Sequence, residues 1–238
     1  MIMRVLLAAI IAGMLAGAVA SAFQIWRVSP LIIAAEVYEN QGSTGTAHSH
    51  GPAQSAEHSH SHSEAGETWA PEDGLERTAY TLLANLIMGV GFALIMAAAV
   101  MFTGRAITTQ NGIMWGLAGF AVFTLAPTTG LAPELPGMPA ADLVARQTWW
   151  WGTAIATGCG IALIALQDKI ALKALGVVVI AAPHIVGAPH PETYESAVPA
   201  NLAADFAANS LAMMALFWVV LGLSMGWAMN RTQPPAES

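Results

Sequence analysis

The chain has 238 residues, of which 55% are hydrophobic and 10% are charged, and its mean hydropathy is +0.57. A soluble globular domain of this length rarely reaches such values, so the composition indicates an integral membrane protein. The formal net charge of −7 has the wrong sign for binding nucleic acid.

Apolar segments that approach or reach the length of a membrane-spanning helix occur up to six times along the chain. A hydrocarbon core of about 30 Å takes roughly 20 helical residues. The third and fifth segments are short, which leaves five spans as an alternative count. Because the alternating polarity of barrel strands is absent, we predict one all-α integral membrane domain over residues 1–238. The six segments are residues 5–26, 80–103, 112–127, 148–166, 170–184 and 206–230.

The first apolar segment also has features of a secretory signal peptide. Arg4 precedes the apolar run, and the Ala-Val-Ala sequence at residues 18–20 resembles a cleavage site. However, the apolar character continues through Trp26, beyond a usual signal core. We therefore interpret this segment as the first membrane helix.

The distribution of charge favours a cytoplasmic location for both ends of the chain. With Met1 inside, five of the eight basic residues fall in inner segments, as the positive-inside rule requires. Thirteen of the fifteen acidic residues and all seven histidines then fall on the outer side. We therefore predict an N-in, C-in helix bundle with an acidic, histidine-bearing outer surface that suits a cation.

The segment from Asn40 to Trp69 is too polar to build a core, and we expect a disordered loop outside the membrane. Neutral imidazole binds Co, Ni, Cu and Zn, but the histidine spacing matches neither a helical metal site nor a zinc finger. We interpret the loop as a flexible metal chelator, with a solvating linker as the alternative. Five of the seven histidines are in this loop: His48, His50, His58, His60 and His62.

Prolines and carboxylates recur at the outer ends of three apolar segments, at residues 30–39, 127–134 and 183–192. Proline leaves a helix carbonyl unpaired, which at membrane depth is tolerated only inside the protein or beside a wet cavity. We interpret the three stretches as turns of helical hairpins whose side chains converge on one outer vestibule, with plain helix exits as the alternative. The predicted metal ligands of the vestibule are Glu36, Glu39, His184, His190 and Glu192.

Five polar side chains lie inside the apolar segments. Intramembrane charges mark transport pathways far more reliably than amides and hydroxyls do. We therefore expect these five side chains to serve helix packing through interhelical hydrogen bonds. They are Gln24, Asn85, Thr153, Thr157 and Asn209.

Sequence motifs of catalysis are absent from the chain. It contains no P-loop, no G-x-S-x-G, no H-E-x-x-H and no G-x-G-x-x-G sequence. The single cysteine, Cys159, excludes an internal disulfide and any paired-cysteine metal site. We therefore predict a protein that is not an enzyme and needs no catalytic cofactor.

Several short sequences along the chain form a specific combination. They include DGLERT at 73–78, WGLAGF at 115–120, PELPG at 133–137, RQTWW at 146–150 and PHIVGAP at 183–189. Together they resemble the proposed cobalt transporter subunits of the CbtA family, and the resemblance covers nearly the whole chain apart from the histidine-rich loop and the tail. It implies about five membrane spans, import of Co²⁺ for cobalamin synthesis, and a small single-span partner with its own histidine-rich motif.

The expected function is therefore import of a divalent metal ion, Co²⁺ or alternatively Ni²⁺, across a bacterial inner membrane. The histidine-rich loop is expected on the periplasmic side, and lipid and the small membrane subunit are the expected partners. A divalent ion gains about 4.6 kcal/mol per 100 mV on entering a negative interior, so import needs no nucleotide. A metal sensor or assembly subunit that binds the ion without conducting it is the alternative function.

Overall fold

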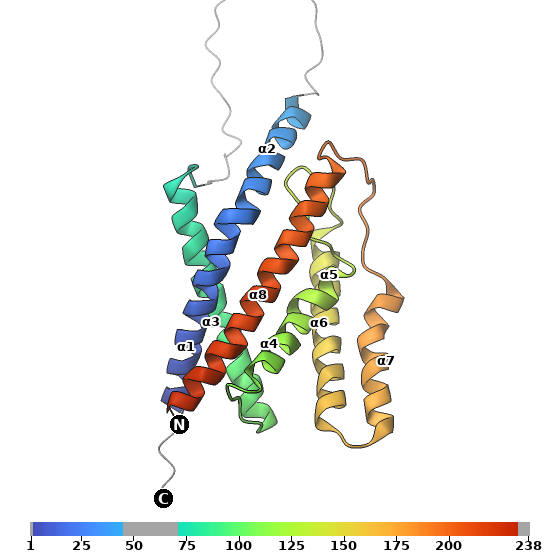
Figure 1. Cartoon of the computed structure of the whole chain (residues 1–238). Helices are drawn as coiled ribbons and strands as arrows, with labels where there is room; N and C mark the ends of the chain where they lie inside the picture. The colour runs from blue at the N-terminus through green and yellow to red at the C-terminus, as the bar shows by residue number, and fades with distance from the viewer. Residues whose placement is uncertain (1, 45–70, 233–238) are drawn as a thin grey trace, which may run out of the picture.

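The computed structural model describes residues 2–44 and 71–232, and the regular elements within these residues are all helical. Figure 1 shows a bundle in which successive helical units alternate in direction. The structure therefore confirms the predicted all-α architecture. The elements are α1 (Ile2–Phe23), the π-helical turn η1 (Gln24–Val28), α2 (Ser29–Thr44), α3 (Leu75–Thr103), α4 (Gly112–Phe120), the π-helical turn η2 (Ala121–Leu125), α5 (Ala126–Thr128), α6 (Leu143–Leu166), α7 (Ile170–Val186) and α8 (Ala200–Thr232).

Six helical units correspond to the six apolar segments of the sequence. Four of them are long and apolar enough to cross a membrane. The other two, Gly112–Thr128 and Ile170–Val186, are the segments that we predicted to be short. At a rise of 1.5 Å per residue, the 17 residues of α7 extend over about 26 Å. The short units therefore come close to the thickness of a hydrocarbon core of about 30 Å.

The first helix is longer than the sequence indicated. α1, η1 and α2 follow one another without interruption, so the helix extends from Ile2 to Thr44. Pro30, which we interpreted as part of a hairpin turn, lies in the first turn of α2. A proline removes one helical hydrogen bond, and its ring crowds the carbonyl one turn earlier. The preceding π-helical turn widens the helix at that carbonyl and accommodates the ring.

Two predictions need correction for this reason. Residues 30–39 are helical, so they do not repeat the turns that follow the third and fifth apolar segments. The polar stretch after α2 also begins later than predicted, because the helix includes Asn40 and continues to Thr44. Polar residues mark the end of an apolar segment, but they do not by themselves end a helix.

Small residues let α1 pack closely between α3 and α8 (Figure 1). Eight of the nine buried residues of α1 are alanine, glycine or serine. A Cβ atom at Gly13 would lie 2.5 Å from the Cα of Val90, and one at Gly17 would lie 2.5 Å from the carbonyl oxygen of Asn85. Helices in lipid associate largely through such close packing, because lipid chains are as apolar as leucine.

Glycines also mark two other helix pairs. Gly112 of α4 and Gly222 of α8 face each other so closely that neither has room for a Cβ atom. In the pair formed by α6 and α7, a Cβ atom at Gly160 would lie 2.6 Å from the carbonyl oxygen of Gly176. The positions of glycine therefore decide which helices pack together.

The bundle has a tightly packed part and a more loosely attached part. We call α1, α3, α4 and α8 the core unit, and α6 with α7 the α6–α7 pair, which meets the rest of the bundle mainly through η2 and α5. There, the ring of Phe123 stacks on Trp218 at 5.7 Å and lies 6.2 Å from Trp150 of α6. Farther along, a cavity of about 540 Å³ separates α6 from α3 and α4, with Arg105 and Asn111 in its otherwise mostly apolar lining.

Candidate metal-binding site

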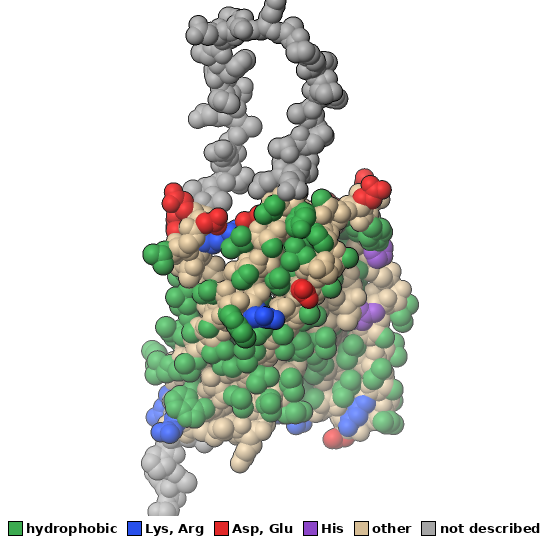
Figure 2. All heavy atoms as spheres, turned by 45° about the horizontal axis from the view of Figure 1, so that its top comes forward, with side chains coloured by type: hydrophobic (Ala, Val, Ile, Leu, Met, Phe, Trp, Pro, Cys, Tyr) green, Lys and Arg blue, Asp and Glu red, His purple; other side chains and the backbone are tan. Residues whose placement is uncertain are grey.

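Acidic side chains predominate at one end of the bundle and basic side chains at the other (Figure 2), although Arg77 and Arg146 lie among the acids and Asp168 lies among the bases. We call the end where α2 ends and α3 begins the acidic end, and the end where α1 begins the basic end. A field of this sign attracts cations to the acidic end. The basic end carries Arg4, Arg105, Lys169, Lys173 and Arg231. The acidic end carries Glu36, Glu39, Glu72, Asp73, Glu76, Glu134, Asp142, Glu192 and Glu195.

The segment predicted to collect metal is attached to the acidic end. It connects α2 to Pro71, with Glu36 and Glu39 preceding it and Glu72 and Asp73 following it. Two pairs of carboxylates therefore flank this segment. Metal binding by the segment stays a prediction. Its histidines lie outside the described residues: His48, His50, His58, His60 and His62.

An ion-pair cluster joins α2 to the start of α3 beside this segment. Arg77 Nη1 donates to Glu36 Oε2 at 3.3 Å, and its Nη2 donates to Glu36 Oε1. The same Nη1 donates to Asp73 Oδ1 at 2.8 Å. Because both oxygens of Glu36 accept from Arg77, a metal ion would compete with the guanidinium for this carboxylate. Glu36 and Arg77 therefore join α2 to the start of α3 in this structure.

Glu39 lies one turn beyond Glu36 and is exposed. The connection between α5 and α6 approaches it at Gly137, whose φ of +79° is a left-handed conformation that glycine adopts without strain. A Cβ atom at Gly137 would lie 3.3 Å from the Cα of Glu39. Below this contact, Leu135 is buried against Ala35 of α2. The connection therefore supports α2 and leaves the Glu39 carboxylate open to solvent.

The two described histidines lie at and beyond the end of α7. His184 Nδ1 is 3.2 Å from the Thr129 hydroxyl, and its ring meets Trp149 edge-on with centroids 5.9 Å apart. Trp149 Nε1 in turn donates to the carbonyl of Pro183 at 3.3 Å. These contacts orient the His184 ring at the junction of α5, α6 and α7. His190 is exposed in the connection that leads to α8.

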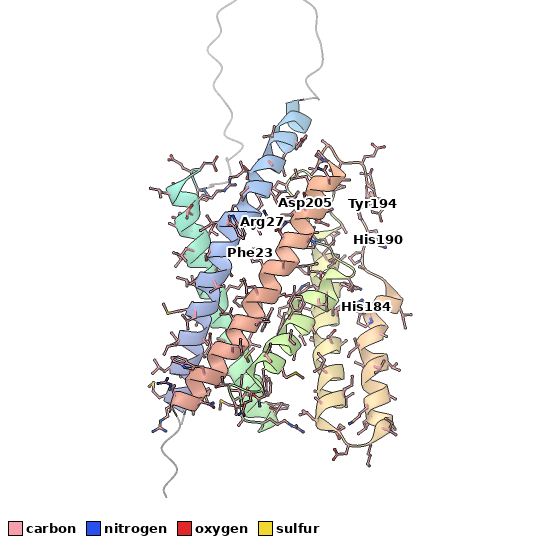
Figure 3. The ribbon with its side chains drawn as sticks, in the orientation of Figure 1. Phe23, Arg27, His184, His190, Tyr194 and Asp205 are labelled. Atoms are coloured by element: carbon pink, nitrogen blue, oxygen red, sulfur yellow. The ribbon has the colours of Figure 1, made fainter. Side chains whose placement is uncertain are left out.

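The structure divides the predicted vestibule ligands between two places. Figure 3 shows His184 and His190 on the α7 side of the bundle, and Glu192 follows in the same connection. Glu36 and Glu39 lie on α2, beside the start of α3. Within residues 2–44 and 71–232, no three His, Cys, Asp or Glu side chains form a group that could hold a metal ion. Metal binding by these five residues therefore stays a prediction, without a preformed site.

Polar side chains inside the bundle mostly follow the packing prediction. Asn85 of α3 donates to Gln24 Oε1 at 2.7 Å and to Ser21 Oγ at 3.2 Å, which links α3 to α1 and η1. The hydroxyls of Thr153 and Thr157 on α6 are also buried, but they find no hydrogen-bond partner in the described part of the chain. Hydrogen bonding is therefore confirmed for the first pair of helices and not for the threonines.

Sequence reasoning missed three interactions of arginine residues. The pair of Arg77 with Asp73 has the i, i+4 spacing of a helical ion pair, which could have indicated it. Its pair with Glu36 joins residues 41 positions apart and has no local signal. Arg27 Nε donates to Asn209 Oδ1 at 3.3 Å, which connects η1 to α8 and was equally unexpected.

Comparison with known proteins identifies a family that the chain matches. The chain matches, over residues 2–230, the family described as "Probable cobalt transporter subunit (CbtA)". The chain belongs to the CbtA family. No curated protein and no solved structure shows significant similarity to it. CbtA membership makes the protein a membrane transporter subunit, and a subunit implies a partner.

Proposed function

We propose that the protein is the membrane-spanning subunit of an importer that carries Co²⁺ into a bacterial cell for cobalamin synthesis, with Ni²⁺ as the alternative ion. Membership of the CbtA family over residues 2–230 carries the proposal. The acidic end, joined to a segment with five of the seven histidines, supports it. In the inner membrane the acidic end faces the periplasm and the basic end faces the cytoplasm, as the positive-inside rule favours.

The first step is capture of the ion outside the membrane by the histidine-rich segment. Imidazole has a reference pKa of about 6.5, so most such rings are unprotonated ligands at neutral pH. The carboxylates around the segment raise the local concentration of divalent cations. Flexible histidine sets offer several alternative coordination modes, which suits capture and release better than tight storage. The segment is thus the collector of the importer.

The second step transfers the ion toward the α7 side of the bundle. His184 and His190 lie there, and Glu192 follows in the same exposed connection. Thr129 and Trp149 orient the His184 ring, which would replace part of the water around the ion. Geometry and supply must provide selectivity for cobalt, because ligand affinity alone favours nickel and copper.

A metal ion cannot cross the membrane through the described bundle as it is arranged here. Cavities of about 540 and 380 Å³ beside α6 are both lined mainly by apolar side chains. Arg105 in the lining of the larger one repels a cation. The pathway is therefore completed by the partner, a small single-span histidine-rich subunit, or opened by separation of the α6–α7 pair from the core unit. The membrane potential supplies the driving force.

The apolar cavities also favour a second candidate function. In that case the chain binds the metal outside and assembles with its partner, but does not itself conduct. The collector and the ion pair of Glu36 with Arg77 would then serve delivery to another subunit. This function shares the metal-binding step and lacks the transport step, so one assay separates the two.

Uptake of radioactive cobalt into reconstituted vesicles tests the proposal. Vesicles would contain this chain alone, this chain with the single-span subunit, or lipid alone, with a negative internal potential imposed. We expect accumulation with both subunits that stops when the potential is collapsed. Cobalt bound at the surface but never accumulated by either protein sample would support the non-conducting function instead. If uptake saturates with Ni²⁺ and not with Co²⁺, Ni²⁺ is the transported ion.

A further inference from the structure

Two exposed charged side chains lie together on the flank formed by η1 and α8 (Figure 3). Arg27 Nε donates to Asn209 Oδ1 at 3.3 Å, and its guanidinium lies 5.3 Å from the ring centre of Trp26. Asp205 is one helical turn before Asn209 on α8, and its carbonyl accepts from the Asn209 amide at 2.7 Å. Neither charge forms an ion pair within the described residues.

Both charges lie at nearly the same level of the bundle (Figure 3). The helix rises about 34 Å from Arg4 to Arg27, and α8 rises about 39 Å from Asp205 to Arg231. Arg4 and Arg231 belong to the basic end, and a hydrocarbon core is about 30 Å thick. Arg27 and Asp205 therefore sit where the apolar layer ends on the acidic side. Figure 2 shows a basic and an acidic side chain close together on this face, surrounded mainly by uncharged surface.

An apolar stripe on α2 extends this face beyond Arg27. Pro30, Ala34 and Val37 follow Arg27 at helical spacings of three, seven and ten residues, and Ile33 lies beside them. All four are exposed, and the exposed fractions of Ile33 and Val37 are 47% and 53%. The stripe lies above the level at which lipid chains end, where water would otherwise cover it. Such a stripe on a helix that projects from the membrane is typical of a surface that another protein covers.

Alanines on α8 provide room for close approach beside Asp205. Ala204, Ala208 and Ala212 are exposed and separated by intervals of four residues. Small residues at this spacing let two membrane helices approach each other closely. The face thus combines an acidic group, a basic group, a small-residue contact line and an apolar extension.

We propose that this face is the contact surface between two copies of the chain. The copies are related by a two-fold axis along the membrane normal, as expected for a symmetric dimer whose chains share one orientation. Rotation about that axis exchanges the two sides of the face and keeps every residue at its own level. Arg27 of each copy then faces Asp205 of the other copy, and two reciprocal ion pairs form.

The pattern of charges selects a second copy over other occupants. A lipid phosphate would neutralise Arg27 but would repel Asp205. A single foreign helix would have to supply both an acid and a base at one level. The second copy supplies both automatically, because opposite charges at equal height on one face are self-complementary under a two-fold rotation. At the edge of the hydrocarbon, water competes less with the pairs than it does in bulk solution.

Cysteine cross-linking of the full chain in native membranes tests the contact. Cys159 of α6 is the single cysteine and is exposed, so the unaltered chain is a control with its thiol on a helix outside the proposed face. The test variant carries Ala208→Cys together with Cys159→Ala and is treated with a short thiol-reactive cross-linker. We expect a product of twice the chain mass from the variant and none from the control. A variant that gives no such product, or a product with a different protein, overturns the proposal.

Charge exchange provides the second test and separates docking from folding. In the Ala208→Cys background, Arg27→Asp and Asp205→Arg each place like charges opposite one another at both pairs. We expect each to lower the cross-linked fraction about tenfold, and the double exchange to restore it. Symmetric elution from a sizing column in detergent shows that the single variants are folded. Folded single variants whose loss the double exchange does not reverse would overturn the reciprocal pairing.

Discussion

In the core unit α1 contacts α3 and α8 along its apolar length, whereas the α6–α7 pair meets the rest of the bundle mainly through η2 and α5. The core helices approach through glycine and alanine backbones that leave no room for sliding. The α6–α7 pair has its own glycine contact, but a cavity of about 540 Å³ separates α6 from α3 and α4. The two regions therefore differ in how freely they can move.

This difference matters because each region carries a different group of predicted metal ligands. The histidine-rich segment is attached to α2, which continues α1, and to the start of α3, and both α1 and α3 belong to the core unit. His184 is held at the end of α7, against α5 and α6. Capture therefore belongs to the rigid region, and transfer belongs to the region that can separate from it.

The largest effect is expected from filling the glycine contact of the core unit. Gly13→Val would drive side-chain atoms into the backbone of α3, which we expect to lower the free energy of unfolding by about 3 kcal/mol. Gly160→Val should cost about 1 kcal/mol, because α6 can shift away from α7 toward the cavity on its other side. Thermal unfolding in detergent measures both. Gly91→Ala, with no atom near its added Cβ, is the control in which no clash arises and no stability should be lost. Equal losses at Gly13 and Gly160 would contradict the comparison.

The next effect concerns capture of the metal ion. Replacement of residues 46–63 by a Gly/Ser segment of equal length should weaken cobalt binding about tenfold, equivalent to about 1.4 kcal/mol. The double variant His184→Gln with His190→Gln should leave capture intact and lower uptake into vesicles. Equilibrium binding of radioactive cobalt and vesicle uptake distinguish the two steps. If the double variant weakened capture as much as the loop replacement, both regions would belong to one site.

The sequence predicts the helical units well because a helix that crosses the bilayer needs an apolar run about as long as the hydrocarbon core is thick. All six apolar segments became helical units, including the two short ones. Pro30 was misinterpreted because a π-helical turn, which has no hydropathy signal, accommodates the ring within a continuous helix. The limits of apolar segments therefore predict membrane spans better than they predict helix ends.

Helix pairing, and with it the candidate site, was harder to predict. Gly13 and Gly17, Gly112 and Gly116, and Gly222 and Gly226 each have a G-x-x-x-G spacing that could have identified the close contacts. The three-residue connection between α6 and α7 indicates that these helices pack on each other, but nothing local indicates that the pair lies apart from α2. The predicted convergence on one vestibule depended on that neighbour relation. Composition alone therefore identified plausible ligands but could not place them together.

A smaller effect is expected from the ion pairs that brace each region at the acidic end. The pair of Arg77 with Glu36 and the pair of Arg146 with Glu134 have similar exposure, but Arg77 binds both Glu36 oxygens and also Asp73. Arg77→Met should therefore cost about 1 kcal/mol, near the upper limit for partly exposed pairs, and Arg146→Met should cost less. High salt should reduce the difference between the two variants. Thermal unfolding at low and high salt measures this, and a larger loss for Arg146→Met would contradict it.

The smallest effect concerns buried polar side chains. It distinguishes those that hold helices together from those that serve transport. Asn85 and Ser21 are hydrogen-bonded between α3 and α1, so Asn85→Leu should destabilise the core unit by about 1 kcal/mol. Thr153→Val and Thr157→Val remove hydroxyls that have no partner in the described residues, and each should be neutral or stabilise the protein by about 0.5 kcal/mol. Cobalt uptake by the threonine variants then tests their role. If uptake is lost while stability is kept, the unpaired hydroxyls line an ion path along α6, and the packing interpretation of α6 is wrong.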